Sequence, residues 1–439
     1  ILRSLMTEIS DHIINVKTIT ATVEKRRTCA WYDSVKNFYD GLLQVANMQT
    51  FFHDHTTGFH TVEPKAVWKE YTEEYYMMDT YYREFHLSFG RSLTESNPAL
   101  DDLFKHVAEK VEGLYTNWFL GQLGNNWSDA CMDEMEKYGH ILEVPQQEVF
   151  YREKIKNADT RVFVIISDAL RYEVAASLTE QLRRETQSKV ELNSCEAIFP
   201  TITKFGMAAL LPHTDLSVEI KNDKLAVLAD GQSTEANNRD KVLKQANPES
   251  IAVKYTDIIG MKRAERSDLV KGKEVVYIYH DTIDAASHTA DSMVFPACDD
   301  TITEIKNLIR IIVNDFGGVN IIITADHGFL YTYSPLSEDS KVDKTSFNQQ
   351  DVEYGRRYAI MQKGAKPDYL LPVKFLGGKA EFDAFAPRES IRIKMNGGGL
   401  NFVHGGISLQ EMVVPVVEYH YLRNTTMEYK RNRKKYDTK

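Results

Sequence analysis

Three aspartates and three histidines lie where this sequence predicts the ends of β-strands or the loops beside them. They are Asp168, Asp284, His288, Asp326, His327 and His404. Carboxylate and imidazole groups bind Zn²⁺ and Mn²⁺ without help from cysteine. Six such ligands exceed what one tetrahedral ion takes and suit two ions with three ligands each. Two ions about 4 Å apart can hold the attacking and the leaving oxygen of a phosphoryl displacement, so this set predicts phosphoryl transfer.

The pair Asp326 and His327 follows a β-branched apolar run at residues 320–325. Such a run is typical of a buried parallel strand, and ligands in open α/β sheets bind just beyond the carboxyl ends of these strands. Taken alone, an acid and an imidazole after a strand more often form a capped turn. Gly328 comes next, and we expect it to let the chain turn tightly out of the sheet.

A phosphoryl displacement of this kind needs a nucleophile, and two threonines are candidates. Thr203 precedes a short predicted helix at residues 205–211, where backbone N–H groups and the helix dipole favour an anion. A hydroxyl held next to a metal ion loses its proton more readily. Thr201 is the competing candidate, and for both residues the alternative is simple capping of the helix. The six metal-ligand candidates make Thr203 the preferred nucleophile.

The elements that must position these residues follow the pattern of an α/β fold. Buried strands are expected at residues 161–167, 190–197, 275–280, 320–325 and 412–421, and helices at 169–184 and around 302–313. This alternation predicts a central, mostly parallel sheet flanked by helices. Residues 214–272 are polar and weakly periodic, so we expect an insertion or a lid over the site. Short strands are expected at residues 358–361, 371–375 and 391–394.

Residues 1–150 are predicted to form an all-helical domain that precedes the catalytic domain at residues 151–425. Apolar and aromatic residues recur there at three- and four-residue spacing, and the region is rich in tyrosine. Tyrosine can stack on nucleic-acid bases, but at helical spacing a role in the core is preferred. Residues 426–439 form a basic tail, typical of a solvated run, which we expect to lead to a missing C-terminal part of a longer polypeptide.

The composition restricts the class of protein. The chain has 439 residues and a formal net charge of −10, so contact with nucleic acid would need a local basic patch or metal ions. Its four cysteines form no C-x-x-C pair, which argues against a disulfide framework and a thiolate zinc site. No apolar run is long enough to span a membrane, and no signal peptide is evident. A reduced, cytoplasmic location without membrane contact is expected.

Five ordered motifs give the chain a resemblance to a known superfamily. They are Ser167-Asp-Ala-Leu-Arg-Tyr-Glu173, Phe199-Pro-Thr-Ile-Thr203, Met207-Ala-Ala-Leu-Leu-Pro212, Ala325-Asp-His-Gly328 and His404-Gly-Gly-Ile-Ser-Leu-Gln-Glu-Met-Val-Val-Pro415. The order of the metal-ligand candidates resembles that of the alkaline phosphatase superfamily, which includes the nucleotide pyrophosphatase/phosphodiesterases. Within it, the motifs look like the PglZ domain of the BREX bacteriophage-defence systems. The resemblance covers about residues 155–420 and implies an alkaline-phosphatase-like fold.

The resemblance also implies a site and an activity. It implies two divalent metal ions, with Zn²⁺ preferred over Mn²⁺ or Mg²⁺, and a Thr203 that attacks phosphorus to form a phosphothreonine. One ion would be held by Asp284, His288 and His404, and the other by Asp168, Asp326 and His327. The implied function is that of a metal-dependent phosphodiesterase or nuclease acting on nucleic acid or a nucleotide, with other BREX proteins as partners. Two alternatives stay open: a phosphomonoesterase or phosphomutase, and a scaffold of a defence complex with little catalysis.

Four basic residues are weaker candidates for binding the substrate. Arg171 and Lys204 each follow a member of the expected site, and Arg356 and Arg357 lie near a predicted strand start. Guanidinium groups can bind phosphate in a bidentate manner, and the Lys204 ammonium could neutralise a departing oxyanion. For Arg171, a structural ion pair with a nearby acid is an equal alternative. For Arg356 and Arg357, the alternative is a solvated turn.

Overall fold

The computed structural model describes the chain except for residues 96, 335, 344–350, 397–400 and 423–439. The expected basic tail at residues 426–439 therefore lies outside the described residues. The α-helices are α1 (Leu2–Ser10), α2 (Val16–Arg26), α3 (Lys36–Asp54), α4 (Pro64–Glu70), α5 (Tyr76–Glu95), α6 (Pro98–Glu112), α7 (Gly121–Lys137), α8 (Tyr172–Glu185), α9 (Thr203–Ala209), α10 (Arg239–Ala246), α11 (Tyr255–Gly260), α12 (Arg263–Leu269), α13 (Thr282–Ser287), α14 (Val294–Asn314) and α15 (Leu409–Met412).

The β-strands are grouped in one large sheet and several small ones. They are β1 (Val162–Ser167), β2 (Ser188–Glu196), β3 (Leu216–Lys221), β4 (Lys224–Ala229), β5 (Gln232–Ser233), β6 (Ser250–Lys254), β7 (Val275–His280), β8 (Asn320–Thr324), β9 (Leu330–Tyr331), β10 (Lys341–Val342), β11 (Asp351–Tyr354), β12 (Ala359–Gln362), β13 (Leu370–Val373), β14 (Phe382–Pro387), β15 (Arg392–Ile393), β16 (Phe402–Val403) and β17 (Val413–Tyr421). The short strands expected at residues 358–361, 371–375 and 391–394 correspond to β12, β13 and β15, which belong to the small sheets.

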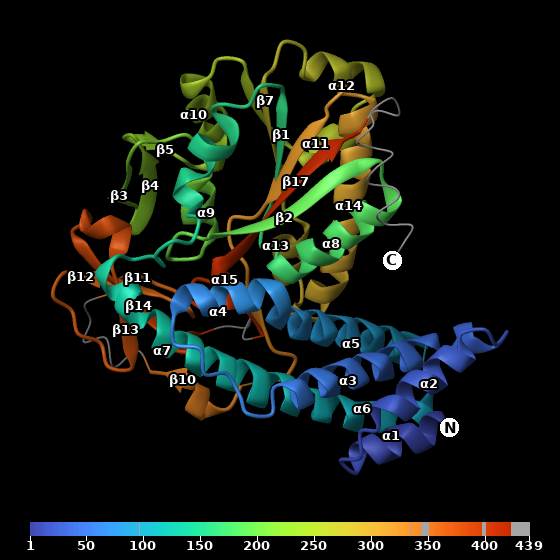
Figure 1. The fold of residues 1–439 in the computed structure, drawn as a ribbon. Coiled ribbons are helices and arrows are strands. Elements are labelled where there is room, and N and C mark those ends of the chain that lie inside the picture. The colour runs from blue at the N-terminus through green and yellow to red at the C-terminus, as the bar shows by residue number, and fades with distance from the viewer. Residues whose placement is uncertain (96, 335, 344–350, 397–400, 423–439) are drawn as a thin grey trace.

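A six-stranded sheet in the order β2-β17-β8-β1-β7-β6 forms the centre of the molecule (Figure 1). β8, β1, β7 and β6 are parallel, and β17 runs antiparallel to β8 and β2, so the expected mostly parallel sheet is confirmed. All residues of β1 are buried, as expected for a strand covered on both faces. Ser167 lies opposite His280, and Ile166 lies opposite Thr324. The chain therefore leaves β1, β7 and β8 at the same edge of the sheet.

Residues 214–272 are more ordered than the sequence suggests. β3, β4 and β5 form a small antiparallel sheet, and β6 is an edge strand of the central sheet that pairs with β7. The expectation that residues 214–272 form only an insertion or a lid is therefore wrong for β6, which belongs to the central sheet. Most of its residues are only partly buried, because an edge strand is not enclosed on all sides. It consequently lacks the continuous apolar run by which the inner strands are recognised.

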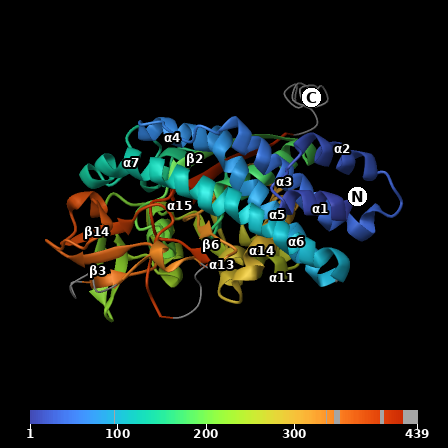
Figure 2. The same ribbon diagram turned by 90° about the horizontal axis from the view of Figure 1, so that it is seen from below.

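The N-terminal helices form an elongated layer beneath the sheet in Figure 1, and Figure 2 shows them running across the molecule. Tyr71, Tyr82 and Tyr115 are buried there, which confirms the preference for core tyrosines over exposed stacking platforms. One continuous cluster of buried apolar residues reaches from Leu2 in α1 to Tyr419 in β17. The helical layer therefore shares its core with the α/β part of the chain. Among the described helices, none combines the length and the apolar character needed to cross a membrane.

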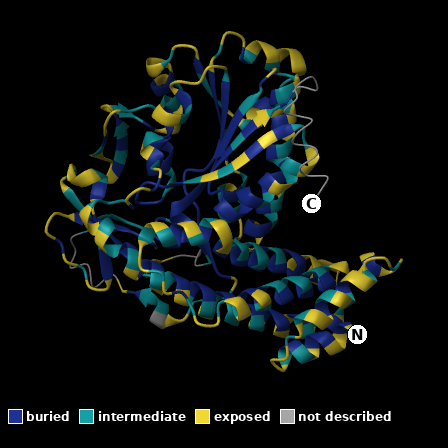
Figure 3. Cartoon of the chain, viewed as in Figure 1, coloured by how far each residue is buried: buried dark blue, intermediate teal, exposed yellow. Residues whose placement is uncertain are grey.

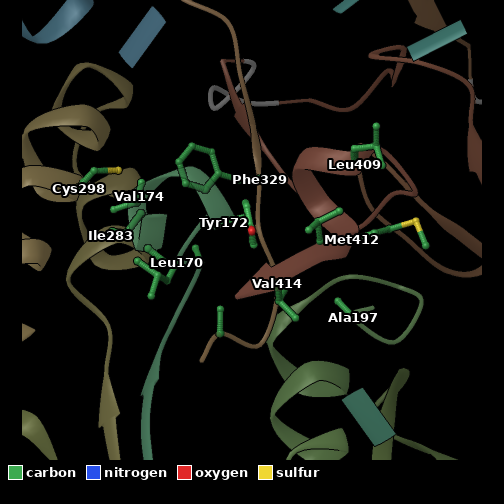
Figure 4. Packing of buried hydrophobic residues seen from close by; sticks show 14 of the residues in the cluster. Leu170, Tyr172, Val174, Ala197, Ile283, Cys298, Phe329, Leu409, Met412 and Val414 are labelled. Carbon is green, nitrogen blue, oxygen red and sulfur yellow. The ribbon is translucent and has the colours of Figure 1, made fainter. Parts of the chain in front are cut away.

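The interior of the central sheet is almost entirely buried, as the dark strands in Figure 3 show. Figure 4 shows how apolar residues pack where the strands end: Leu170, Val174 and Ile283 lie close together, with Phe329 beside them. All four side chains are buried. The loops that carry the candidate metal ligands are thus fixed by well-packed apolar neighbours on either side.

Candidate metal centre

Three buried side chains at the ends of β1 and β8 form the centre of the site. Asp168 directly follows β1, and Asp326 and His327 follow β8 after one intervening residue. Nε2 of His327 lies 3.7 Å from Oδ1 of Asp168 and 3.3 Å from Oδ2 of Asp326. One ligand atom from each of the three residues lies within 4.8 Å of the others. The parallel pairing of β1 with β8 brings these residues together from distant parts of the chain.

The carboxylate oxygens of this cluster are suited to receive a cation. Oδ1 of Asp168 and Oδ2 of Asp326 are buried and have no hydrogen-bond partner among the described residues. Burial, together with the nearby Asp326 and Asp284 carboxylates, raises the pKa of Asp168 well above its usual range. A divalent ion between the carboxylates would supply the missing positive charge and lower that pKa. Two carboxylates and one imidazole are a donor set that Zn²⁺ and Mn²⁺ accept.

Backbone contacts hold the carboxylate of Asp326 in place. Its Oδ1 accepts a hydrogen bond from the backbone N–H of Ala169 at 3.1 Å. Ala169 has a φ of 60°, a left-handed conformation that is unfavourable for a residue with a side chain and is often found at functional sites. Gln147 donates hydrogen bonds of 2.9 Å to the carbonyl oxygens of Ala325 and Asp326. Gln147 is a supporting residue that no sequence motif identifies, because it lies in the segment before β1.

Backbone carbonyls also orient two imidazoles. Nδ1 of His327 lies 2.8 Å from the carbonyl oxygen of Gly328, and Nδ1 of His404 lies 3.2 Å from that of Thr201. With the proton on Nδ1, each ring keeps the lone pair of Nε2 available for a metal ion. The two rings are stacked, with centroids 4.1 Å apart. Burial and the neighbouring His327 lower the pKa of His404 to about 4, so this ring is neutral at pH 7.

The two candidate nucleophiles have different surroundings. Thr203 begins α9, and its Oγ1 lies 3.2 Å from Nε2 of His327. Thr201 is completely buried. Its hydroxyl donates to the carbonyl oxygen of Gly406 at 2.7 Å and accepts a hydrogen bond from the N–H of Gly405 at 3.1 Å. Thr201 therefore connects two loops, whereas the Thr203 hydroxyl lies at the cluster of metal-ligand candidates.

The residues expected to hold a second ion are gathered less tightly. Nε2 of His288 lies 3.2 Å from Oδ2 of Asp284, but the His288 side chain is 78% exposed. His404 instead stacks on His327. Within the described part of the chain, a compact trio of ligand atoms occurs at Asp168, Asp326 and His327 and not at this second set. The Asp284 carboxylate nevertheless acts on the cluster. Its negative charge raises the pKa of His404 and so opposes the larger lowering by burial and by His327.

A cavity of about 670 Å³ opens beside the two sets of candidate ligands. Its lining includes Thr203, Lys204, Asp284, His288, Arg356 and His404. Nζ of Lys204 lies 2.6 Å from the carboxylate of Glu353, so this ammonium reaches the cavity as part of an ion pair. The structure thus places two of the four predicted substrate-binding residues, Lys204 and Arg356, on the cavity wall.

The other two predicted substrate-binding residues, Arg171 and Arg357, form ion pairs inside the protein. The Arg171 guanidinium is buried and lies 2.8 Å from the carboxylate of Asp79. The Arg357 guanidinium is fully buried and lies 2.9 Å from the carboxylate of Glu411. Neither arginine lines the cavity beside Thr203. The structural ion pair given above as the alternative for Arg171 is therefore confirmed, and the solvated turn is wrong for Arg357, whose side chain is buried.

Two glycines allow the close packing of the segments around Asp326. A Cβ atom on Gly206 would lie 2.2 Å from the carbonyl oxygen of Asp326, so α9 could not approach the cluster with any larger residue. A Cβ atom on Gly328 would lie 2.0 Å from the carbonyl oxygen of Gln410. Gly328 is not among the residues with positive φ. Close packing against α15 is therefore a structural reason for a glycine at this position.

The chain matches one family model and two relatives of known family. Residues 145–419 match the family model described as the BREX system PglZ alkaline phosphatase-like domain. The chain is 33% identical over 427 residues to the alkaline phosphatase-like protein PglZ of Bacillus cereus (strain H3081.97), which covers 95% of this chain and 48% of that protein. It is 34% identical over 453 residues to the alkaline phosphatase-like protein BrxZ of Escherichia coli O9:H4 (strain HS), which covers 100% and 52%. The chain thus spans about half the length of these relatives.

Solved structures with similarity to the chain include two ectonucleotide pyrophosphatase/phosphodiesterases. The murine type 5 enzyme superposes with a TM-score of 0.39 at 14% sequence identity, over 59% of this chain and 88% of that chain. The human type 5 enzyme superposes with a TM-score of 0.40 at 12% identity, over 59% and 87%.

Proposed function

The chain belongs to the PglZ family of BREX alkaline phosphatase-like domains, and on that premise we propose that it is a metal-dependent phosphodiesterase. The observation that carries this proposal is the contact of 3.2 Å between Oγ1 of Thr203 and Nε2 of His327. It lies beside two buried carboxylate oxygens that have no hydrogen-bond partner among the described residues. The proposed substrate is a phosphodiester of a nucleic acid or a nucleotide. The proposed setting is the cytoplasm, with other proteins of a BREX bacteriophage-defence system as partners.

The proposed cofactors are two divalent ions, with Zn²⁺ preferred over Mn²⁺ or Mg²⁺. One would be held by Asp168, Asp326 and His327, and the other by Asp284, His288 and His404. When bound, such ions neutralise the charge of the phosphate and favour the deprotonated form of a nearby hydroxyl. The neutral His404 ring and the Nδ1 contacts of both buried histidines support this assignment, because a metal ligand must present an unprotonated nitrogen.

The proposed reaction has two steps that the residues of the chain organise. Oγ1 of Thr203 forms a bond to phosphorus while the bond from phosphorus to the leaving oxygen breaks, and the threonine proton ends on the departing alcohol. Water then attacks the phosphothreonine and gives a phosphomonoester and the free Thr203 hydroxyl. The position of Thr203 in the first turn of α9 supports this role, because backbone N–H groups there favour an anionic oxygen. The ion pair of Lys204 with Glu353 holds a cation next to the nucleophile.

Hydrolysis of chromogenic esters tests the proposal. The chain, loaded with Zn²⁺, Mn²⁺ or Mg²⁺ in turn, is assayed on bis(p-nitrophenyl) phosphate and on p-nitrophenyl phosphate. We expect faster turnover of the diester and loss of activity after chelation. Faster turnover of the monoester would favour the phosphomonoesterase or phosphomutase alternative. Activity that survives complete chelation would contradict the metal-dependent mechanism.

A defence assay tests the alternative role as a scaffold. In this experiment a full-length relative carries alanine at the position that matches Asp326 of this chain. Its assembly with partner proteins is checked by co-purification. If catalysis is the function, a protein that assembles normally loses protection against phage. Unchanged protection would favour a scaffold with little catalysis.

A further inference from the structure

A second cavity, of about 320 Å³, adjoins the candidate metal centre and is lined by cations. Its charged lining residues are Lys204, Lys221, Lys224, Arg239 and Glu235. Lys204 and Lys224 also line the cavity that contains Thr203, so the two cavities share part of their walls. We call the second one the basic cavity. Its four cations face one carboxylate, in a chain whose net charge is −10.

Two of these cations differ from the others because no carboxylate of the described residues forms an ion pair with them. Lys204 pairs with Glu353 at 2.6 Å, and Lys221 pairs with Glu235 at 3.4 Å. In contrast, Lys224 and Arg239 form no ion pair within the described part of the chain. A concentration of cations that lacks counter-charges on the protein is stabilised by an anionic ligand.

Hydrogen bonds hold the segments that carry the two unpaired cations. Nζ of Lys204 donates to the carbonyl oxygen of Leu225 at 2.8 Å, and the N–H of Leu225 donates to Glu353 at 3.0 Å. These bonds anchor the start of β4, which carries Lys224, next to the first turn of α9. Arg239 donates to the carbonyl oxygen of Thr234 at 3.2 Å, and its guanidinium lies 4.9 Å from the centre of the Tyr279 ring. These contacts hold the backbone at Lys224 and the guanidinium of Arg239 in place.

We propose that the basic cavity binds a second phosphate of the substrate. The inference rests on the proposed function and specifies its substrate. That substrate is a phosphodiester that carries at least one phosphate besides the one that is cleaved. Cations without counter-charges favour a phosphate over a neutral group. The second phosphate belongs either to the next nucleotide of a strand or to the phosphate chain of a nucleotide. Both have the same anionic chemistry, and the experiment below distinguishes them.

Binding is tested separately from hydrolysis. Fluorescence anisotropy measures the affinity of a labelled oligothymidylate for the metal-loaded Thr203→Ala chain, and then for the same chain with Lys224→Glu or Arg239→Gln added. We expect each added change to raise Kd about tenfold and to lower the slope of log Kd against log salt concentration by about one. The matched control is Lys271→Glu, at an exposed lysine in the turn before β7, which should leave both values unchanged. Equal affinities for all four proteins would overturn the inference.

Hydrolysis of matched esters identifies the source of the second phosphate. The esters are thymidine 5′-(p-nitrophenyl phosphate), its 3′-phosphorylated form, and a p-nitrophenyl ester of thymidine 5′-diphosphate. We expect at least one form with two phosphates to have a kcat/KM about tenfold above that of the simple ester, and Lys224→Glu to reduce this advantage. An advantage for the 3′-phosphate indicates a strand, and one for the diphosphate indicates a nucleotide. No advantage for either would overturn the inference. If no ester is cleaved, the proposed function fails, whereas the anisotropy measurement still decides whether the basic cavity binds phosphate.

Discussion

The guanidinium of Arg171 lies 2.8 Å from the carboxylate of Asp79, and both side chains are almost completely buried. Arg171 lies in the loop that begins with Asp168, and Asp79 is in α5 of the N-terminal layer. Tyr71 and Tyr115 donate hydrogen bonds of 2.7 and 2.6 Å to the same carboxylate. This network attaches the helical layer to the loop that carries a candidate metal ligand. The N-terminal helices therefore contribute to positioning the site.

Replacing Asp79 by alanine should destabilise the protein strongly. The change leaves the Arg171 guanidinium buried without its counter-charge, which costs about 3–5 kcal/mol. The measurement is the free energy of unfolding from a urea titration followed by circular dichroism. The matched control is Arg91→Ala, which removes the exposed ion pair of Arg91 with Asp299 and should cost about 1 kcal/mol or less. A similar loss of unfolding free energy in both variants would show that the buried pair stabilises the protein no more than an exposed one.

Replacing Thr203 by alanine should abolish hydrolysis while leaving metal binding intact. Loss of a covalent nucleophile lowers kcat by about 10³-fold or more. The measurement is kcat on the chromogenic diester, together with mass spectrometry of acid-quenched protein, which should detect a phosphate on Thr203 in the wild type. Thr201→Ser is the control, because it keeps the hydroxyl that bonds to Gly406 and Gly405. A phosphate found on Thr201 would reverse the assignment of the two threonines.

Replacing Asp168 by asparagine should change stability in opposite directions with and without metal. Its Oδ1 is buried without a hydrogen-bond partner among the described residues, so a neutral amide removes a costly charge and should raise the melting temperature of the metal-free chain. The same change removes a metal ligand and should abolish most of the rise in melting temperature that Zn²⁺ causes in the wild type. Differential scanning fluorimetry with and without Zn²⁺ checks both effects. An unchanged response to Zn²⁺ would exclude Asp168 as a ligand.

The strands that position the site are predictable because they are buried runs of apolar residues. β7 occupies Val275–His280, as expected, and the candidate ligands follow where such runs stop. β6 escapes prediction because a five-residue edge strand is only partly buried. The acids that pair with Arg171 and Arg357 also escape prediction. These acids, Asp79 and Glu411, come from other elements, and no local pattern in the sequence announces a pairing across the fold.

Glu196 should make stability depend on pH. Burial raises the pKa of this carboxyl to about 8, despite the hydrogen bonds that it accepts from Gln146 and Ile141. The folded chain therefore holds the proton more tightly than the unfolded chain, so the free energy of unfolding should fall as pH rises from about 4.5 to 8, by at most about 1.4 kcal/mol per pH unit. Glu196→Gln keeps an acceptor oxygen and should remove this fall. Unfolding at pH 5.5 and 7.5 checks it, with Glu191→Gln, at an exposed position of the same strand, as the control.

Replacing Gly206 by alanine should displace the nucleophile. The new Cβ would lie 2.2 Å from the carbonyl oxygen of Asp326, so α9 must shift, at a cost of about 1–3 kcal/mol. Because Thr203 begins α9, a shift of the helix of about 1 Å should lower kcat on the chromogenic diester by about 10²-fold. Gly90→Ala is the matched control, since Gly90 is also in a helix but has no atom within 4 Å of the added Cβ; it should leave kcat unchanged and stabilise α5 by about 0.5–1 kcal/mol. Wild-type kcat and stability in the Gly206 variant would show that α9 tolerates the contact and that its approach to Asp326 does not set the position of Thr203.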